Sequence, residues 1–207
     1  MHAKQKSKEE VVEEFRVSSI TEAAMRVIAR KGLAGATMQE VAHEAGVAKG
    51  TLYLYFSDRE DLFEKTSEYA CTYLTGQADE ALRSEGSFAD RLRALVRSQL
   101  EAFDRNQEFF RAFVAMAEQR QPSRSSHSRN TVQKMQTTRM SEFFAGAIAA
   151  GELRDVDPGR LAVFFVEGLK GVILRRLEDR TRTPIDDDVD LVTSLFLEGT
   201  SRKGKKG

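Results

Sequence analysis

The sequence lacks the features of a secreted, membrane-spanning or sheet-rich protein. Its 207 residues include one cysteine, three prolines and no tryptophan. The single cysteine, Cys71, excludes an internal disulfide. No apolar run reaches the roughly 18 residues that cross a bilayer, and the polar N-terminus has no signal-peptide core. These absences favour the cytoplasm. The scarcity of alternating β-branched residues favours an all-α fold.

The sequence also lacks an excess of charge of either sign. Lysine plus arginine and aspartate plus glutamate both number 32, so the global positive charge of many nucleic-acid-binding proteins is missing. Phosphate contacts act over a short range in salt, and a local basic surface is therefore sufficient for binding DNA. Net charge neither supports nor excludes a DNA-binding protein.

Groups that carry catalytic or metal chemistry are sparse. The three histidines, His2, His43 and His127, have no metal-ligand spacing. The run Asp186–Asp188, with Asp190, follows Thr183-Pro184. Negative charge stabilises a helix start there, and we prefer this reading to a cation site. The sequence therefore predicts no enzymatic activity, no cofactor and no metal.

The most informative stretch, Thr37–Phe56, predicts two short helices joined by a glycine. Thr37 and Glu40 have the spacing of a capping box. Gly46 suits the left-handed residue that ends a helix. The first helix has one apolar face, with spacings i, i+3, i+4 and i+7, made by Met38, Val41, Ala42 and Ala45.

The second helix of this stretch is predicted to begin near Ala48 and to anchor itself through Leu52 and Phe56. Its other face offers a cation, a bare backbone and three hydroxyls, from Lys49, Gly50, Thr51, Tyr53 and Tyr55. Two helices with these properties are typical of a helix-turn-helix whose second helix enters the major groove of DNA. A helical hairpin with ordinary surface residues is the alternative.

The segment GVAKGTLYLYFSDREDLF resembles the signature of the TetR family of bacterial transcriptional regulators, and the match runs from about Thr21 to Lys65. Beyond Lys65 the resemblance is only architectural. It implies an N-terminal three-helix helix-turn-helix domain and a larger C-terminal helical bundle for ligand binding and dimerisation. The predicted divisions are a flexible basic arm (1–12), the DNA-binding domain (13–65), the effector and dimerisation domain (66–200) and a disordered basic tail (201–207).

The expected DNA contacts lie in and around the predicted recognition helix. Lys49 is placed to reach a phosphate or a guanine edge, and Gly50 permits a close approach of the backbone. Leu54 either touches a thymine methyl group or is simply exposed. The resemblance adds phosphate contacts, and the full predicted set is Thr37, Lys49, Gly50, Thr51, Tyr53, Leu54, Tyr55 and Arg59.

Further helices are predicted after Lys65, with a break near Asn106 and new starts at Ser87, Asp157 and Thr183. The helix 159–178 is apolar nearly all round and therefore needs cover on every side. We expect the last two helices to pair with a second copy of the chain, with burial within one chain as the alternative. An effector pocket is expected at Phe110, Phe113, Met116, Phe143, Phe144 and Phe165.

The sequence thus predicts a homodimeric repressor that binds a palindromic operator in double-stranded DNA and responds to a small hydrophobic or aromatic effector. The alternative is an architectural or cell-division-type DNA-binding regulator with no effector.

Overall fold

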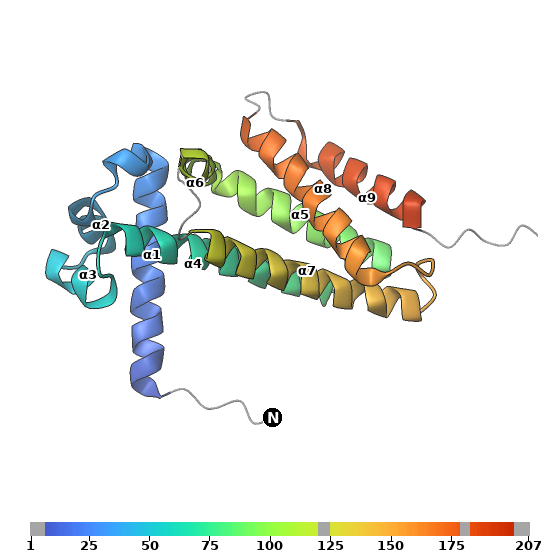
Figure 1. Ribbon diagram of the computed structural model, residues 1–207, viewed down its shortest axis with the longest axis horizontal. Coiled ribbons are helices and arrows are strands. Elements are labelled where there is room, and N and C mark those ends of the chain that lie inside the picture. Colours follow the sequence, from blue (N-terminus) through green and yellow to red (C-terminus); the bar gives the residue numbers. More distant parts are fainter. Residues whose placement is uncertain (1–6, 120–124, 179–182, 201–207) are drawn as a thin grey trace, which may run out of the picture. The chain divides into compact units, whose positions relative to one another are not determined.

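The computed structural model describes residues 7–119, 125–178 and 183–200, with side chains except at 71–75, 113, 115–119 and 125–132. These residues form helices and no extended strand (Figure 1), which confirms the predicted all-α class. In this part of the chain, no helix is long and apolar enough to cross a membrane. The helices are α1 (Lys8–Gly35), α2 (Met38–Ala45), α3 (Lys49–Tyr55), α4 (Arg59–Leu82), α5 (Phe88–Arg105), α6 (Gln107–Gln119), α7 (Ser125–Ala149), α8 (Pro158–Glu178) and α9 (Ile185–Thr200).

The first helix begins at Lys8, five residues before the predicted start near Glu13. A capping box causes the difference: the Glu10 amide donates to the Ser7 hydroxyl (3.2 Å), and the Ser7 amide donates to the Glu10 carboxylate (2.7 Å). Residues 8–12 of the predicted flexible arm are therefore helical, while residues 1–6 lie outside the described part. Near the other end, Gly32 interrupts α1 with a φ of 67°.

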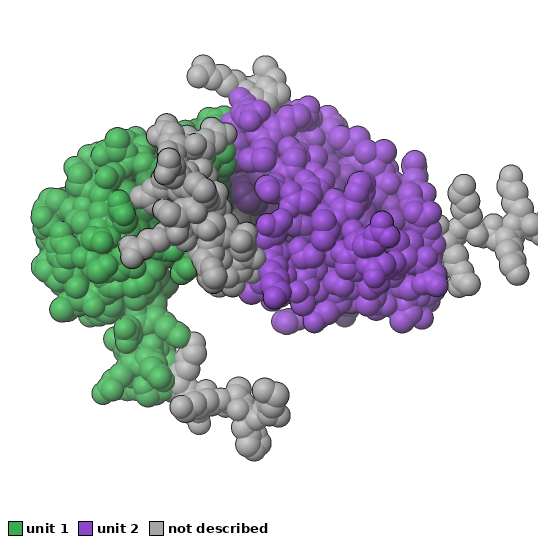
Figure 2. Space-filling model, in the orientation of Figure 1, with its two compact units in different colours: residues 1–71, 106–121 green, residues 72–105, 122–207 purple. Residues whose placement is uncertain are grey.

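The chain divides into two compact units, which Figure 2 colours separately. Unit 1 comprises residues 1–71 and 106–121, and therefore contains α1 to α3, the first half of α4, and α6. Within unit 1, α1 packs against both α2 and α6. The predicted domain boundary at residue 65 stays a prediction, because spatial contacts do not test which segments fold independently. The interior of unit 1 includes the buried residues Ile20, Val27, Val41, Leu52, Phe56, Leu62 and Phe109.

Unit 2 comprises residues 72–105 and 122–207. In this unit α7 packs along α8, and α5 contacts both α8 and α9. Its interior is centred on Phe144, whose ring centroid lies 5.0 Å from that of Phe196, 5.6 Å from that of Phe165 and 6.1 Å from that of Phe88. These four aromatic residues come from four different helices and hold the bundle together.

Two of the predicted helix starts in unit 2, at Ser87 and Asp157, are confirmed by their caps, and α9 begins at Ile185, directly after the predicted Thr183-Pro184 start. The Asp90 amide donates to the Ser87 hydroxyl (3.2 Å), and the Arg160 amide donates to Asp157 (2.7 Å). At the start of α9, the aspartate run is used in ion pairs. Asp186, Asp188 and Asp190 pair with Arg97, Arg176 and Arg93 in that order, which fastens α9 to α5 and α8.

Candidate DNA-binding surface

The two short helices α2 and α3 are joined by a turn that the sequence specifies closely. Thr37 caps α2 by accepting a hydrogen bond from the Glu40 amide (3.2 Å). At the other end, Gly46 is left-handed, with φ 67° and ψ 30°. The amides of Gly46 and Val47 donate to the carbonyls of His43 and Ala42 (3.2 and 3.0 Å), which is the Schellman arrangement. The predicted start and end of α2 are confirmed, but only the Thr37 half of the predicted capping box is present, because the Glu40 carboxylate pairs with Lys31.

The helix α3 is attached to unit 1 by one side only. Leu52 and Phe56 are fully buried and face the interior. The Lys65 ammonium donates to the Tyr55 carbonyl (2.9 Å) and lies 5.2 Å from the centre of the Phe56 ring. Lys65 therefore binds a carbonyl that the last turn of α3 leaves without a helical partner. The remaining faces of this seven-residue helix are free to meet a partner molecule.

A row of ion pairs fixes α2 on α1. The Glu44 carboxylate accepts from Arg30 (2.6 Å) and Arg26 (2.8 Å), and Lys31 pairs with Glu40 (2.8 Å). The hydrogen bonds from Arg30 and then Arg26 lower the pKa of Glu44 to about 2. The hydrogen bond from Lys31 likewise lowers the pKa of Glu40. These pairs use three cations of α1 to hold the helix-turn-helix in place, so they are not spare charge for DNA.

Arg59, a predicted phosphate contact, has partners inside the chain. Its guanidinium donates to the Ala36 carbonyl (2.9 Å) and to the Leu33 carbonyl, and lies 4.8 Å from the centre of the Phe63 ring. Arg59 thus ties the start of α4 to the last turn of α1 and to Ala36, which follows it. A contact with phosphate stays a prediction, and the geometry gives this side chain a positioning role.

The other predicted contacts lie on or beside α3. Lys49 and Gly50 are exposed, whereas Thr51 and Tyr55 are half-buried. Tyr53 is 49% exposed and Leu54 is 78% exposed. Thr37, at the start of α2, is exposed and accepts through its oxygen, which leaves its hydroxyl proton available for donation. The whole predicted set stays a prediction about DNA, since all of it concerns contacts with a second molecule.

Sequence reasoning missed the residues that position this surface, namely Arg26, Arg30, Glu44 and Lys65. A signal for two of them was present. Arg26 and Arg30 lie four residues apart on α1, and this spacing puts both side chains on one face of a helix. Nothing in the sequence pairs that face with Glu44, which lies 14 residues beyond Arg30.

The six predicted effector-pocket residues are divided between the two units. Phe110 is buried in unit 1, while the side chains of Phe113 and Met116 lie outside the described part. Phe144 and Phe165 are buried in the interior of unit 2, and Phe143 stacks on Phe88 with a centroid distance of 4.9 Å. A pocket bordered by all six therefore stays a prediction.

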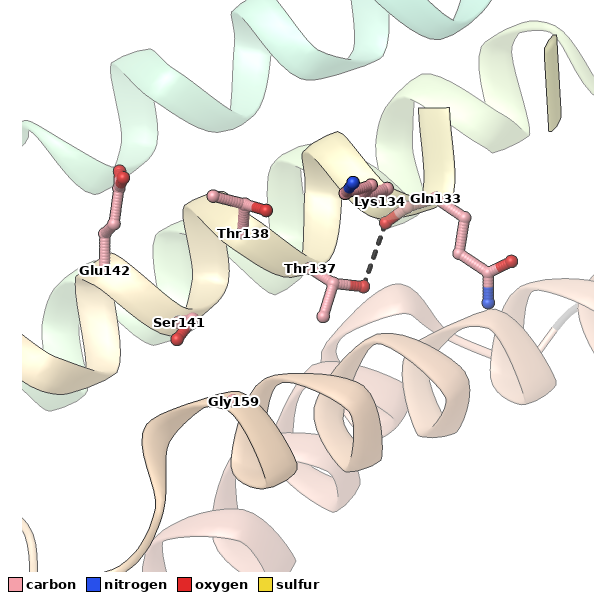
Figure 3. Close-up of a pocket in the computed structure, with 7 residues that line it drawn as sticks. All are labelled: Gln133, Lys134, Thr137, Thr138, Ser141, Glu142 and Gly159. Atoms are coloured by element: carbon pink, nitrogen blue, oxygen red, sulfur yellow. Dashed lines mark hydrogen bonds between the residues drawn. The ribbon is translucent and has the colours of Figure 1, made fainter. Parts of the chain in front are cut away.

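Unit 2 carries one groove of a different character, between α7 and α8 (Figure 3). It has a volume of about 500 Å³ and contains none of the six predicted pocket residues. The Gln133 side chain donates to Glu167 of α8 (2.7 Å). Hydroxyl, amide and charged side chains border the groove, which lies along α7 and reaches α8 at Gly159. The lining residues are Gln133, Lys134, Thr137, Thr138, Ser141, Glu142 and Gly159.

The fold of unit 1 and its exposed α3 define a helix-turn-helix protein of the DNA-binding kind. Residues 20–66 match the family model described as "Bacterial regulatory proteins, tetR family". This match covers the helix-turn-helix of the chain, and the relatives described below are named as regulators.

Two curated relatives and one solved structure extend the similarity beyond the helix-turn-helix. The fatty acid metabolism regulator protein of Bacillus subtilis is 29% identical over 147 residues, covering 69% of this chain and 73% of that protein. The HTH-type transcriptional repressor KstR2 of Rhodococcus jostii is 24% identical, covering 89% and 90%. The structure of FadR from Bacillus subtilis in complex with stearoyl-CoA superposes with a TM-score of 0.74 at 17% identity, covering 87% and 97%.

Three other matches are short. They are uncharacterized HTH-type transcriptional regulators of Bacillus subtilis, with identities of 36–43%, and the chain covers only 17%, 36% and 30% of their lengths. The higher identities are thus confined to short stretches of 50–69 residues. The likeness to the solved structure, at its low identity, shows the common fold of the remainder.

Proposed function

We propose that this protein is a ligand-responsive cytoplasmic repressor that binds a palindromic operator as a homodimer. The observation that carries the proposal is α3, which is anchored by Leu52 and Phe56 and leaves Lys49, Gly50, Tyr53 and Leu54 exposed. In a helix-turn-helix, the second helix lies in the major groove and its exposed side chains reach base edges and phosphates. The match of residues 20–66 to the tetR family model supports the same assignment.

Binding by two copies follows from the size of one α3. Its seven residues span only about 10 Å at 1.5 Å per residue, which covers a few base pairs. Two recognition helices set one helical turn apart, about 34–36 Å, read two half-sites and give the operator its palindromic symmetry. A homodimer supplies this arrangement.

The surface proposed for dimerisation lies on α8 and α9. We define the dimer face as the exposed apolar side chains Val163 (51% exposed), Phe164 (71%), Leu191 (47%) and Leu195 (64%). On α8, Gly168 and Gly171 follow Phe164 at i+4 and i+7, on the same side of the helix, and a Cβ atom built at either meets nothing within 4 Å. A second copy covers these apolar groups, and the glycines let its helices approach closely.

The effector is proposed to be a small hydrophobic or aromatic molecule held within the helical bundle. The apolar interior of unit 2 and the stearoyl-CoA complex of the structural relative support this class, and they make long-chain acyl-CoA thioesters the first compounds to test. The effector releases DNA only if it binds the DNA-free conformation more tightly. A hundredfold loss of DNA affinity needs about 2.7 kcal/mol of such coupling.

Selection of bound sequences from random duplex DNA tests the DNA-binding part of the proposal. We expect one enriched palindrome with half-sites about 10 base pairs apart. Lys49→Ala weakens binding to it by about 1–3 kcal/mol and reduces the salt dependence by about one ion, whereas Tyr53→Phe weakens binding by a comparable amount without changing that slope. Enrichment of no sequence contradicts the proposal, and unchanged binding in both variants contradicts the placement of α3 in the groove.

Transcription from a promoter that carries the selected operator tests repression and release. We expect the protein to reduce transcription and stearoyl-CoA or a related acyl thioester to restore it. The same compound should raise the melting temperature of the protein, because a ligand that binds only the folded state stabilises it. If a screen of hydrophobic compounds yields no shift and no release of operator DNA, the regulator works without an effector.

A further inference from the structure

The side chain that points most directly away from the core of unit 1 on α3 is a leucine. Successive helical residues are rotated by about 100°. Leu54 therefore lies about 180° from the midpoint of Leu52 and Phe56, the two buried residues of this helix. With an exposure of 78%, it is the most exposed of the large apolar side chains that the structure describes.

Gly50 stands one turn before Leu54 on the same side, and a Cβ built there meets nothing within 4 Å. Helical side chains lean toward the N-terminus, so Leu54 lies over the surface that Gly50 leaves bare. We define Gly50 and Leu54 as the outward ridge of α3. Tyr53 and Tyr55 lie on its two flanks, each about 80° from the buried face. The polar groups of α3 thus border the ridge and do not form it.

A ridge without side-chain donors or acceptors cannot read the hydrogen-bonding edge of a base. The major groove offers one apolar group, the 5-methyl group of thymine, and 5-methylcytosine carries the same group. From this geometry we propose that Leu54 selects the operator by packing on the 5-methyl group of a pyrimidine, thymine in unmodified DNA. The inference rests on the proposed DNA-binding function and adds the chemical feature that the recognition helix reads.

The position of the leucine supports a binding role over a folding role. Its side chain is mostly in water, so its apolar surface contributes little to the stability of unit 1. A contact between Leu54 and one methyl group involves no charged group. It therefore suits the second half of α3, since the cation of this helix, Lys49, is its first residue.

Replacement of single thymines by deoxyuridine in the selected operator tests the inference. Deoxyuridine keeps the base pair and loses only the methyl group. When the critical thymine is replaced in one half-site only, wild-type protein should bind the uracil duplex about fourfold more weakly, the change that corresponds to about 0.8 kcal/mol for one buried methyl group. Leu54→Ala should bind the thymine and uracil duplexes equally. Because this side chain is exposed, the variant is expected to fold.

Tyr53→Phe is the matched control: its overall affinity falls, yet its ratio of thymine to uracil binding stays about fourfold. With cytosine at the same position, 5-methylation should strengthen binding by wild-type protein and leave Leu54→Ala unaffected. Such a double-mutant comparison removes effects of the methyl group on DNA shape, since both proteins meet the same duplexes.

The outcomes separate this inference from the proposed function. If wild-type protein binds the operator but shows a ratio of one at every thymine, the leucine does not read a methyl group and DNA binding still stands. A fourfold ratio that persists in Leu54→Ala assigns the methyl group to another residue and overturns the inference. If no sequence is enriched from random DNA, both proposals fall.

Discussion

The recognition helix and the dimer face both leave large apolar side chains in water, yet their surroundings differ. On α3 one exposed leucine stands beside a lysine and two tyrosines, and the exposed faces of α2 and α3 are otherwise polar. On α8 and α9, four exposed apolar residues occur with two glycines. A lone apolar group among donors suits a polar duplex with an occasional methyl group, whereas a broad apolar face suits another protein surface.

The two units also use ion pairs differently. In unit 1 the pairs of Glu44 with Arg26 and Arg30 lie at the surface, with arginine exposures of 52% and 53%. In unit 2, Asp188 is 2% exposed and pairs with Arg176, which is 7% exposed and also donates to Asp104 (2.6 Å). Exposed pairs contribute little to stability, while loss of one partner from a buried pair leaves a charge without compensation.

Phe164→Glu tests the comparison of apolar surfaces, and it should have the largest effect of the substitutions considered, a loss of dimerisation. It places an unpaired carboxylate in the proposed dimer interface, which costs at least about 3 kcal/mol. Dimerisation should weaken roughly 100-fold, and operator binding should fall with it. Sedimentation across a concentration series measures the dissociation constant. Phe15→Glu is the matched control, because Phe15 is equally exposed (72%) but lies on α1. Equal dissociation constants in both variants would contradict the assigned dimer face.

Asp188→Asn sharpens the comparison of ion pairs. It removes the charge of the most buried partner of Arg176, and we expect a loss of about 3 kcal/mol in the free energy of unfolding. Denaturant titration at neutral pH measures the change. Asp190→Asn serves as the control, since Asp190 is 61% exposed in its pair with Arg93 and its loss should cost under about 1 kcal/mol. A similar loss in both would show that burial does not set the strength of these pairs.

Substitutions at two glycines of the helix-turn-helix distinguish an effect on stability from an effect on DNA binding. Gly46→Ala puts a side chain at a φ of 67° and should destabilise the protein by about 1–2 kcal/mol. Gly50→Ala lies within α3 in open space and should stabilise it by about 0.5 kcal/mol, yet weaken operator binding by obstructing the backbone's approach. Thermal unfolding and operator titration of both variants check these signs. Improved operator binding by Gly50→Ala would contradict the placement of the outward ridge in the major groove.

The extent to which the sequence predicts each region follows from how local its interactions are. The cap at Thr37, the turn at Gly46 and the anchors Leu52 and Phe56 involve residues within one or two turns, and they were predicted correctly. The start of α1 was predicted wrongly, because the box formed by Ser7 and Glu10 was overlooked. The contacts of Arg59 with Ala36, and of Arg176 with Asp104, join residues 23 and 72 positions apart, and no local pattern encodes such pairings.

Glu44→Gln provides the smallest expected effect and tests the exposed ion pairs of unit 1. The pKa of Glu44 is about 2 in the folded protein, against 4.5 for an unperturbed glutamate, because Arg30 and Arg26 donate to it. The unfolded chain therefore binds the proton more readily. The stabilisation by this carboxylate is fully present above about pH 4.5 and is lost as the pH falls toward 2. Melting temperatures of wild-type protein and variant should differ slightly at pH 6 and converge on acidification. A constant difference between them would show that the packing of the side chain, and not its charge, holds α2 on α1.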